Sequence, residues 1–256
     1  MSQSHPITHC EPLALFEEGT VVAEFVRERD DDNAYQSEAA LEKAFIKQLQ
    51  AQAYEYLPIT SEVELVANLR RQLEKLNGMT FSDAEWENFF STCIAGNNDG
   101  IIEKTTRIQE DHIQILKRDD GSTKNIYLID KQRIHNNSLQ VVNQYEAVGN
   151  YANRYDVTVL VNGLPLVHIE LKRRGVDIRE AFNQINRYQR DSFWAGCGLF
   201  EYAAVHHQQR HTDQILQQYR SERAPCRTAG QKIPTEKLQQ FCFYQLVGRR
   251  PKPAHY

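Results

Sequence analysis

The chain has 256 residues, which is enough for one large domain or two small ones with a proper hydrophobic core. Its hydrophobic content of 41% and charged content of 25% are typical of a soluble globular protein, and no apolar run approaches the ~18 residues of a membrane helix. The net charge is −4, but residues 203–256 hold nine Lys and Arg against three Asp and Glu, so residues 1–202 carry −10 and offer no general basic surface to nucleic acid.

The N-terminal residues and the spacing of the cysteines bear on the cellular location and on the kinds of site that the protein can contain. The first ten residues, "MSQSHPITHC", lack the basic-then-apolar layout of a signal peptide, so a cytoplasmic address is expected. The five cysteines are scattered and include no CxxC pair. This spacing argues against a zinc site or a disulfide framework and favours reduced thiols.

Three helices are predicted after a mixed, acidic lead-in over residues 1–34. Each begins at a serine that can cap its first turn and carries apolar residues at helical spacing. The second ends at Gly78, because glycine readily takes the left-handed conformation of a helix C-terminus. The predicted helices cover residues 35–54, 61–78 and 82–96, with the caps Ser37, Ser61 and Ser82, and weaker helical periodicity follows over 100–110.

After residue 110 the pattern changes to short β-type runs separated by turn residues. These runs cover residues 112–118, 125–131 and 139–147. Two more apolar runs surround an Asn-Gly turn in "NRYDVTVLVNGLPLVHIELKRRG" (residues 153–175), and a helix is predicted over 176–193. The order of helices, strands and a final helix predicts an α/β domain with a mixed sheet.

The Asn-Gly hairpin carries three charged residues among its apolar ones, and its register decides whether they meet. With a two-residue loop, Asn162-Gly163, Asp156 would lie across from Ile169, with Glu170 on the opposite face. With a three-residue loop ending at Leu164, Asp156 would lie across from Glu170. Gly163 suits the left-handed position of such a loop, so we expect this second register.

In that register Lys172, two residues beyond Glu170, lies on the same face. Two facing carboxylates in apolar surroundings are stable only if they are protonated, paired or bound to a cation. Oxygen ligands suit a hard divalent ion such as magnesium, and a nearby lysine can orient water at a phosphate. The alternative is a surface hairpin with Glu–Lys and Asp–Arg ion pairs, which the short spacing alone favours.

The stretch resembles the D…(D/E)xK signature of the PD-(D/E)xK nuclease superfamily. More narrowly, "NRYDVTVLVNGLPLVHIELKRRGVDIREAFNQINRY" resembles the N-terminal nuclease domain of type I restriction enzyme R (restriction) subunits. The likeness includes "YQSEAALEKAFIKQLQAQAYEYL", "NGMTFSDAEWENFF" and "KNIYLIDK", and so spans most of residues 35–202. It implies an α/β (α+β) fold with a restriction-endonuclease-like mixed sheet flanked by helices and an added N-terminal helical portion.

The resemblance also implies roles for individual residues. Asp156 and Glu170 match the family's magnesium ligands, and Lys172 matches the lysine that takes part in phosphodiester hydrolysis. Gln184 and Tyr188 match a QxxxY element that shares one helix face and supports the site. Glu38 and Glu42 are both candidates for the superfamily's extra carboxylate, and His168 is interpreted as a sheet residue, not a ligand.

A basic cluster surrounds the predicted site. Its simplest interpretation is an ordinary solvated surface without a function. If the site is real, the cluster supplies phosphate contacts that the acidic body lacks. Its members beside Lys172 are Arg173, Arg174, Arg179, Arg187 and Arg190. We also expect Lys172→Ala to leave the fold intact, because an exposed lysine contributes little to packing.

The function implied is that of a magnesium-dependent DNA endonuclease domain in a type I restriction–modification system. Its partners would be double-stranded DNA and the modification and specificity subunits. The full-length family uses ATP in motor domains, but this chain has no GxxxxGK[ST] loop, so no residue is assigned to ATP. The alternatives are a catalytically silent, truncated remnant or docking module and, more weakly, a structural or RNA-binding domain.

Residues 203–256 are predicted to be an aberrant, out-of-frame and poorly ordered tail. They include nine Gln and four His, and the resemblance stops after "LFEY". Reading the degenerate codons of "AAVHHQQRHTDQILQQYR" one base later permits "QLFIISNGTQTKYYSNT", an apolar strand and an Asn-Gly turn like those of the R subunits. "LQQFCFYQLVGRR" permits "FNSFVFTSWWAD" in the same frame. Such a shift would replace the last core strand and leave the sheet edge unpaired.

Overall fold

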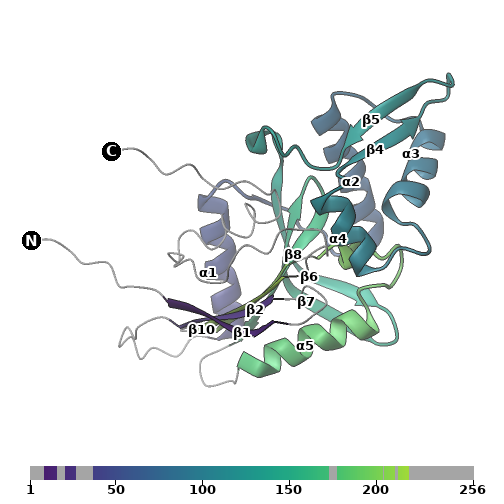
Figure 1. The fold of residues 1–256 in the computed structure, drawn as a ribbon. Coiled ribbons are helices and arrows are strands. Elements are labelled where there is room, and N and C mark those ends of the chain that lie inside the picture. Colours follow the sequence, from purple (N-terminus) through teal and green to yellow (C-terminus); the bar gives the residue numbers. More distant parts are fainter. Residues whose placement is uncertain are drawn as a thin grey trace, which may run out of the picture.

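A computed structural model of the chain describes residues 9–15, 21–26, 37–172, 178–203, 205–210 and 213–218 (Figure 1). All of the predicted helices are present in this part of the chain. No described helix is long and apolar enough to cross a bilayer. The helices are α1 (Glu38–Ala51), α2 (Glu62–Asn77), α3 (Asp83–Phe89), α4 (Ile101–Gln109) and α5 (Ile178–Asp191).

The predicted caps explain where the first helices begin. Ser37, Ser61 and Ser82 each accept a hydrogen bond from the backbone N–H three residues later, which satisfies an otherwise unpaired donor. Gly78 ends α2 with a φ of 57°. The third helix differs from the prediction, because α3 stops at Phe89 and continues as a π-helical turn over Phe90–Ile94.

The strands form a mixed sheet, as predicted, and helices flank it. The strand order is β1-β2-β10-β9-β8-β7-β6-β3, and the β8–β9 and β3–β6 pairs are parallel. A separate two-stranded sheet joins β4 (Ile113–Lys117) and β5 (Thr123–Tyr127). The members of the large sheet are β1 (His9–Leu15), β2 (Val21–Val26), β3 (Glu55–Tyr56), β6 (Leu139–Val148), β7 (Ala152–Val161), β8 (Leu164–Lys172), β9 (Val205–Arg210) and β10 (Asp213–Gln218).

Both ends of the chain contribute strands that the sequence did not predict. β1 and β2 lie within the expected lead-in, and β9 pairs with β8 along the edge that was expected to be unpaired. Backbone N–H and C=O groups form the hydrogen bonds between these strands, so a segment rich in Gln and His can still form a strand. The domain limits and the reading frame of residues 203–256 stay predictions, and most of that segment lies outside the described residues.

The buried apolar side chains of the described residues form one cluster. Both α1 and α5 pack against β8, and the sheet runs between these two helices in Figure 1. The helices α2, α3 and α4 and the β4–β5 ribbon stand beside the sheet. Leu41, Phe45 and Leu49 enter the cluster from α1, while Leu65, Leu69 and Leu73 enter it from α2.

The turn between β7 and β8 is buried, although Asn-Gly turns usually lie in water. Asn162 and Gly163 form a two-residue loop with φ values of 52° and 84°, as a type I′ turn requires. The Asn162 amide donates to the backbone oxygen of Leu128 at 3.0 Å and to the side chain of Asn137 at 2.7 Å. A Cβ at Gly163 would lie 2.6 Å from the Cα of Leu69 on α2. The turn is therefore fixed by contacts on both of its residues.

A β-bulge next to this turn sets the register of the hairpin. Val161 pairs with Leu164 and Leu160 with Pro165, but Val159 pairs with Val167. Leu166 is therefore an extra residue on β8, beside a proline that has no N–H to give to the ladder. The three-residue loop predicted from the sequence is wrong.

The register expected farther along the hairpin is nevertheless present. Val157 pairs with Ile169 and Thr158 with His168, and the next step along this register brings Asp156 opposite Glu170. The bulge adds one residue to β8 and so restores the position of Asp156 opposite Glu170, which the two-residue loop alone would not give.

Replacing Gly163 should show how far the hairpin depends on its contact with α2. We expect Gly163→Ala to lower the free energy of unfolding by about 1–2 kcal/mol for the left-handed backbone and by a further ~1–3 kcal/mol for the clash with Leu69. Urea unfolding at fixed pH measures both.

Gly121→Ala is the matched control for this variant. Gly121 has a φ of 81°, and a Cβ there meets nothing within 4 Å, so only the backbone cost should remain. Equal losses in the two variants would show that the buried turn contributes no steric constraint.

Candidate active site

Asp156 on β7 and Glu170 on β8 interact at the end of the hairpin away from the turn. Glu170 is fully buried, and Asp156 is partly buried. One carboxylate oxygen of Asp156, Oδ2, accepts a hydrogen bond from the Leu171 N–H at 3.0 Å. The pKa of Asp156 is raised to about 7, chiefly by burial and then by the charge of Glu170, while the Leu171 N–H and Lys172 oppose the shift. The pair therefore resists being doubly ionised unless a cation is present.

Lys172 completes the predicted group. Its Nζ lies 3.0 Å from Glu170 Oε1, and its side chain is only 12% exposed. The expectation of an exposed lysine is therefore wrong. Lys172 sits beside a fully buried carboxylate, so removing its charge would leave Glu170 without a counter-ion in the described structure.

The second oxygen of Glu170 is the least satisfied atom of the site. Glu170 Oε2 is buried and has no hydrogen-bond partner among the described residues. His168 Nε2 lies 3.6 Å away, and the His168 side chain is fully buried as well. Its ring meets Tyr155 and Tyr188 edge-on, at centroid distances of 5.2 and 5.7 Å. His168 is a sheet residue, as predicted, but sequence gave no sign that it borders Glu170.

The two residues of the QxxxY element meet beside these carboxylates. The Tyr188 hydroxyl donates to the backbone oxygen of Arg154 at 3.1 Å, and the Gln184 amide donates to that hydroxyl. Burial and, after it, the charge of Glu170 raise the pKa of Tyr188 to about 12. Tyr188 is therefore a neutral hydroxyl at ordinary pH, suited to fixing the strand end.

Glu42, one of the two candidate extra carboxylates, contacts the sheet next to Asp156. It accepts hydrogen bonds from the side chains of Asn143, at 2.5 Å, and Gln144. Gln144 lies between the residues of β6 that pair with Val157 and Tyr155, so it stands opposite Asp156, and its φ is 52°. The structure ties Glu42 to that position. A role for Glu42 or Glu38 in the site stays a prediction.

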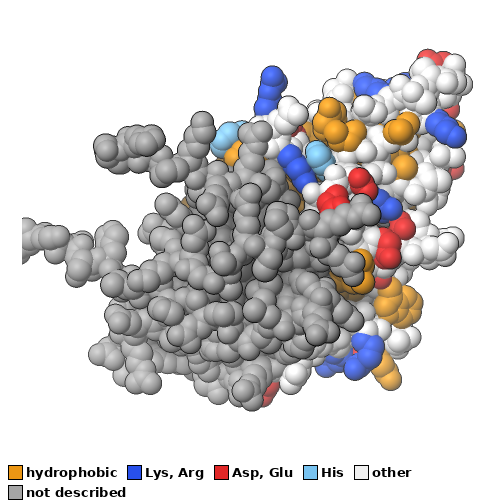
Figure 2. Space-filling model, in the orientation of Figure 1, with side chains coloured by type: hydrophobic (Ala, Val, Ile, Leu, Met, Phe, Trp, Pro, Cys, Tyr) orange, Lys and Arg blue, Asp and Glu red, His pale blue; other side chains and the backbone are white. Residues whose placement is uncertain are grey.

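The basic cluster is described only in part. The Arg187 guanidinium lies 5.5 Å from the centre of the Tyr188 ring, and Arg190 pairs with Asp191 at 2.9 Å. Figure 2 shows blue and red side chains interspersed over the described part of one face. Arg173, Arg174 and the side chain of Arg179 lie outside the described residues.

The donor set fits a hard divalent cation more closely than a softer metal. Among the described residues no three His, Cys, Asp or Glu side chains gather as a metal cluster. The site instead offers two carboxylates, and one of them has a buried oxygen without a hydrogen-bond partner among the described residues. Oxygen ligands of this kind, completed by water and substrate oxygens, suit magnesium.

Comparison with known proteins matches most of the chain to one family. The family model described as "Type I restriction enzyme R protein N terminus" matches residues 35–220. The chain is 50% identical over 170 residues to the type I restriction enzyme EcoprrI endonuclease subunit of Escherichia coli, covering 66% of this chain and 54% of that protein. It is 43% identical over 173 residues to the SsaAORF53P endonuclease subunit of Staphylococcus saprophyticus, covering 66% and 18%. The chain thus spans about half of the first relative and less than a fifth of the second.

The raised pKa of Asp156 predicts how stability depends on pH. Between about pH 4, where the unfolded carboxyl ionises, and pH 7, the unfolded state releases a proton that the folded state keeps, so stability falls as pH rises. Asp156→Asn keeps an oxygen for the Leu171 N–H but removes this effect. In EDTA the variant should match the parent near pH 4 and exceed it at pH 8, by up to ~1.4 kcal/mol for each pH unit between about pH 4 and pH 7.

Urea unfolding at pH 4, 6 and 8 measures this difference. Asp111→Asn, at an exposed carboxylate, should keep the pH dependence of the parent. Parallel curves for the parent and Asp156→Asn would contradict the proposed coupling of the two carboxyls.

Proposed function

The chain belongs to the family of type I restriction enzyme R protein N-termini, and from that membership we propose that it is a magnesium-dependent DNA endonuclease domain. The observation that carries the proposal is the convergence of Asp156, Glu170 and Lys172 at one end of the β7–β8 hairpin. A surface hairpin would expose these groups, whereas Glu170 is fully buried. Burying two like charges together is costly unless the site has a use for them.

Asp156 and Glu170 would hold the magnesium ion. When bound, the ion supplies a Lewis acid that offsets negative charge at a phosphate and makes a nearby water more acidic. Glu170 Oε2 is the oxygen without a hydrogen-bond partner in the described structure, so it is the first candidate to face the ion. Asp156 Oδ2 is already held by the Leu171 N–H, which fixes the direction of its other oxygen.

Lys172 would act on the phosphodiester, because its ammonium is held in place by Glu170 and still has donors to spare. An ammonium group has three N–H donors, and only one is needed for the contact with Glu170 Oε1 at 3.0 Å. The others can orient a water or a phosphate oxygen. Tyr188 and Gln184 hold the end of β7 in position through the backbone oxygen of Arg154.

The rest of the proposed activity follows from the family. The substrate is double-stranded DNA, with Arg187 and Arg190, and with Arg173, Arg174 and Arg179, as phosphate contacts. The partners are the modification and specificity subunits of a type I restriction complex, and the setting is the cytoplasm. ATP is used by the family's motor domains, and no residue of this chain is assigned to it.

Cleavage of plasmid DNA tests the catalytic assignment. With Mg²⁺ the parent should cut, and Glu170→Gln and Lys172→Gln should cut at least about 100-fold more slowly, because even loss of a residue supporting a metal ligand often costs 10–100-fold. Lys117→Ala, an exposed lysine on β4, is the control and should cut like the parent. Unchanged cutting by Lys172→Gln would mean that the lysine is misassigned.

Cation binding provides a test that does not need turnover. At 100 times its dissociation constant, Mg²⁺ should stabilise the parent by about 2.7 kcal/mol and Glu170→Gln by much less. In EDTA, Lys172→Ala should unfold more easily than the parent by about 3–5 kcal/mol, since Glu170 loses its counter-ion.

Added Mg²⁺ should recover part of the loss in Lys172→Ala. If the parent neither binds Mg²⁺ nor cuts, the chain is a silent docking module instead of a nuclease.

A further inference from the structure

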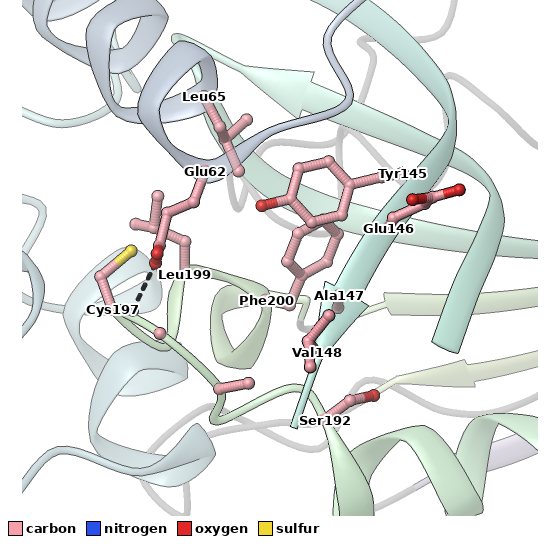
Figure 3. Close-up of a pocket in the computed structure, with 12 residues that line it drawn as sticks. Glu62, Leu65, Tyr145, Glu146, Ala147, Val148, Ser192, Cys197, Leu199 and Phe200 are labelled. Atoms are coloured by element: carbon pink, nitrogen blue, oxygen red, sulfur yellow. Dashed lines mark hydrogen bonds between the residues drawn. The ribbon is translucent and has the colours of Figure 1, made fainter. Parts of the chain in front are cut away.

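A cavity of about 170 Å³ has a lining that includes none of the predicted site residues (Figure 3). It lies between the first turn of α2, the end of β6 and the loop that follows α5. Its apolar walls include Leu65, Leu199 and Phe200, and neither Asp156 nor Glu170 lines it. The volume is below the ~300–1,000 Å³ of sites for drug-sized ligands, so a single side chain fits better than a nucleotide or cofactor.

One wall of the cavity carries a carboxylate without a cation. Glu62, an exposed residue on the first turn of α2, accepts a hydrogen bond from the Cys197 N–H at 2.5 Å, and no Lys or Arg pairs with it among the described residues. The loop can approach this carboxylate because residue 196 is glycine, where a Cβ would lie 2.2 Å from Glu62 Oε1. The lining contains no basic side chain. The cavity is therefore negative and open to a cation.

A tyrosine hydroxyl faces the same space. Tyr145 is only 5% exposed, and its hydroxyl has no hydrogen-bond partner among the described residues. Figure 3 shows the Tyr145 ring reaching from β6 toward the wall that carries Glu62 and Leu65. The hydroxyl is therefore available to a polar group that enters the cavity, because a tyrosine hydroxyl can both donate and accept a hydrogen bond.

The cysteine in the lining is not a nucleophile. Burial and, after it, the neighbouring Glu62 carboxylate raise the pKa of the Cys197 thiol to about 12. A thiol in this state stays protonated and unreactive, because the thiolate is the reactive form. The cavity is thus suited to binding instead of covalent chemistry.

Exposed apolar side chains occur on the segments that form the cavity, and one of them, Val148, lines it. Of the nine large apolar side chains exposed among the described residues, four lie on the segments that frame the cavity: Val63, Val148, Tyr151 and Trp194. Such a rim around a small polar pocket resembles protein interfaces, where Trp, Tyr and Arg contribute most of the binding energy. It does not resemble a site for a free ion, which needs no apolar rim.

We propose that this cavity and its rim form a protein docking site that receives an arginine side chain of a partner protein. The guanidinium would pair with Glu62 and donate to the Tyr145 hydroxyl, while its methylenes lie against Leu65 and Leu199. Arginine fits better than lysine, because its planar group has several fixed donors and stacks on aromatic rings such as Phe200.

Nuclear magnetic resonance of the full ¹⁵N-labelled chain tests the selectivity of the cavity. The probe is n-butylguanidinium, an arginine side chain without a backbone, and the control is n-butylurea, which has the same shape and no charge. Saturable shifts of the Cys197 amide and the Trp194 indole N–H are expected, with a dissociation constant on the order of 1 mM, corresponding to about −4 kcal/mol. Butylurea should bind at least tenfold more weakly.

Two variants decide whether the named groups are responsible. Glu62→Gln keeps an oxygen for the Cys197 N–H but loses the charge, and it should weaken butylguanidinium binding at least tenfold. Tyr145→Phe should weaken it about threefold, and Glu87→Gln, at an exposed carboxylate on α3, should not change it. Equal binding of the two probes, or unchanged binding by Glu62→Gln, would overturn the proposal.

Peptides then test whether the occupant belongs to a protein. Ac-Leu-Arg-Leu-NH2 should bind at least threefold tighter than Ac-Gly-Arg-Gly-NH2, and Trp194→Ala should remove the difference. If the leucines do not strengthen binding, the cavity is a site for a small cation, and the proposal of a protein docking site is overturned. Sedimentation velocity shows whether the parent forms dimers. If it does, and if Glu62→Gln abolishes them, the site binds a second copy of this chain, and the proposal of a separate partner protein is overturned.

Discussion

Two carboxylates, Asp156 and Glu170, are held close together where little water reaches them, and the rest of the site depends on how their charges are compensated. Burial and mutual repulsion both disfavour the doubly ionised pair. Lys172 offsets part of the charge from 3.0 Å, and in the proposed function a divalent cation offsets the remainder. Groups that repel each other stay together only on a rigid support, which here is a hairpin whose turn is buried against α2.

Local chemistry was enough to predict the helices and the mixed sheet. A serine that caps a first turn acts within three residues, so Ser37, Ser61 and Ser82 marked the helix starts without knowledge of the fold. The change from α-helix to π-helix after Phe89 was not predicted, because it has no comparable local signal. The strands at both ends of the chain were also missed, since their side chains do not alternate in polarity as the rule for strands expects.

The sequence predicted which residues form the candidate site, but only part of what surrounds them. Spacing and resemblance brought Asp156, Glu170 and Lys172 together, but the burial of Lys172 and the position of His168 depend on residues far away in the chain. Tyr188 meets the ring of His168 across 20 positions of sequence, and no periodicity reveals such a contact. The cavity at Glu62 was invisible for the same reason, as α2, β6 and the loop after α5 meet only in the folded chain.

The extra residue at Leu166 limits how the length of this hairpin can change during evolution. Side chains alternate along a strand, so inserting or deleting one residue between the turn and Glu170 would send that carboxylate to the other face, whereas a change of two would not. Odd and even spacings between the two acids are thus not equivalent. A relative whose hairpin differs by one residue must gain or lose a bulge as well, and hairpin lengths should drift in steps of two wherever the acid pair is kept.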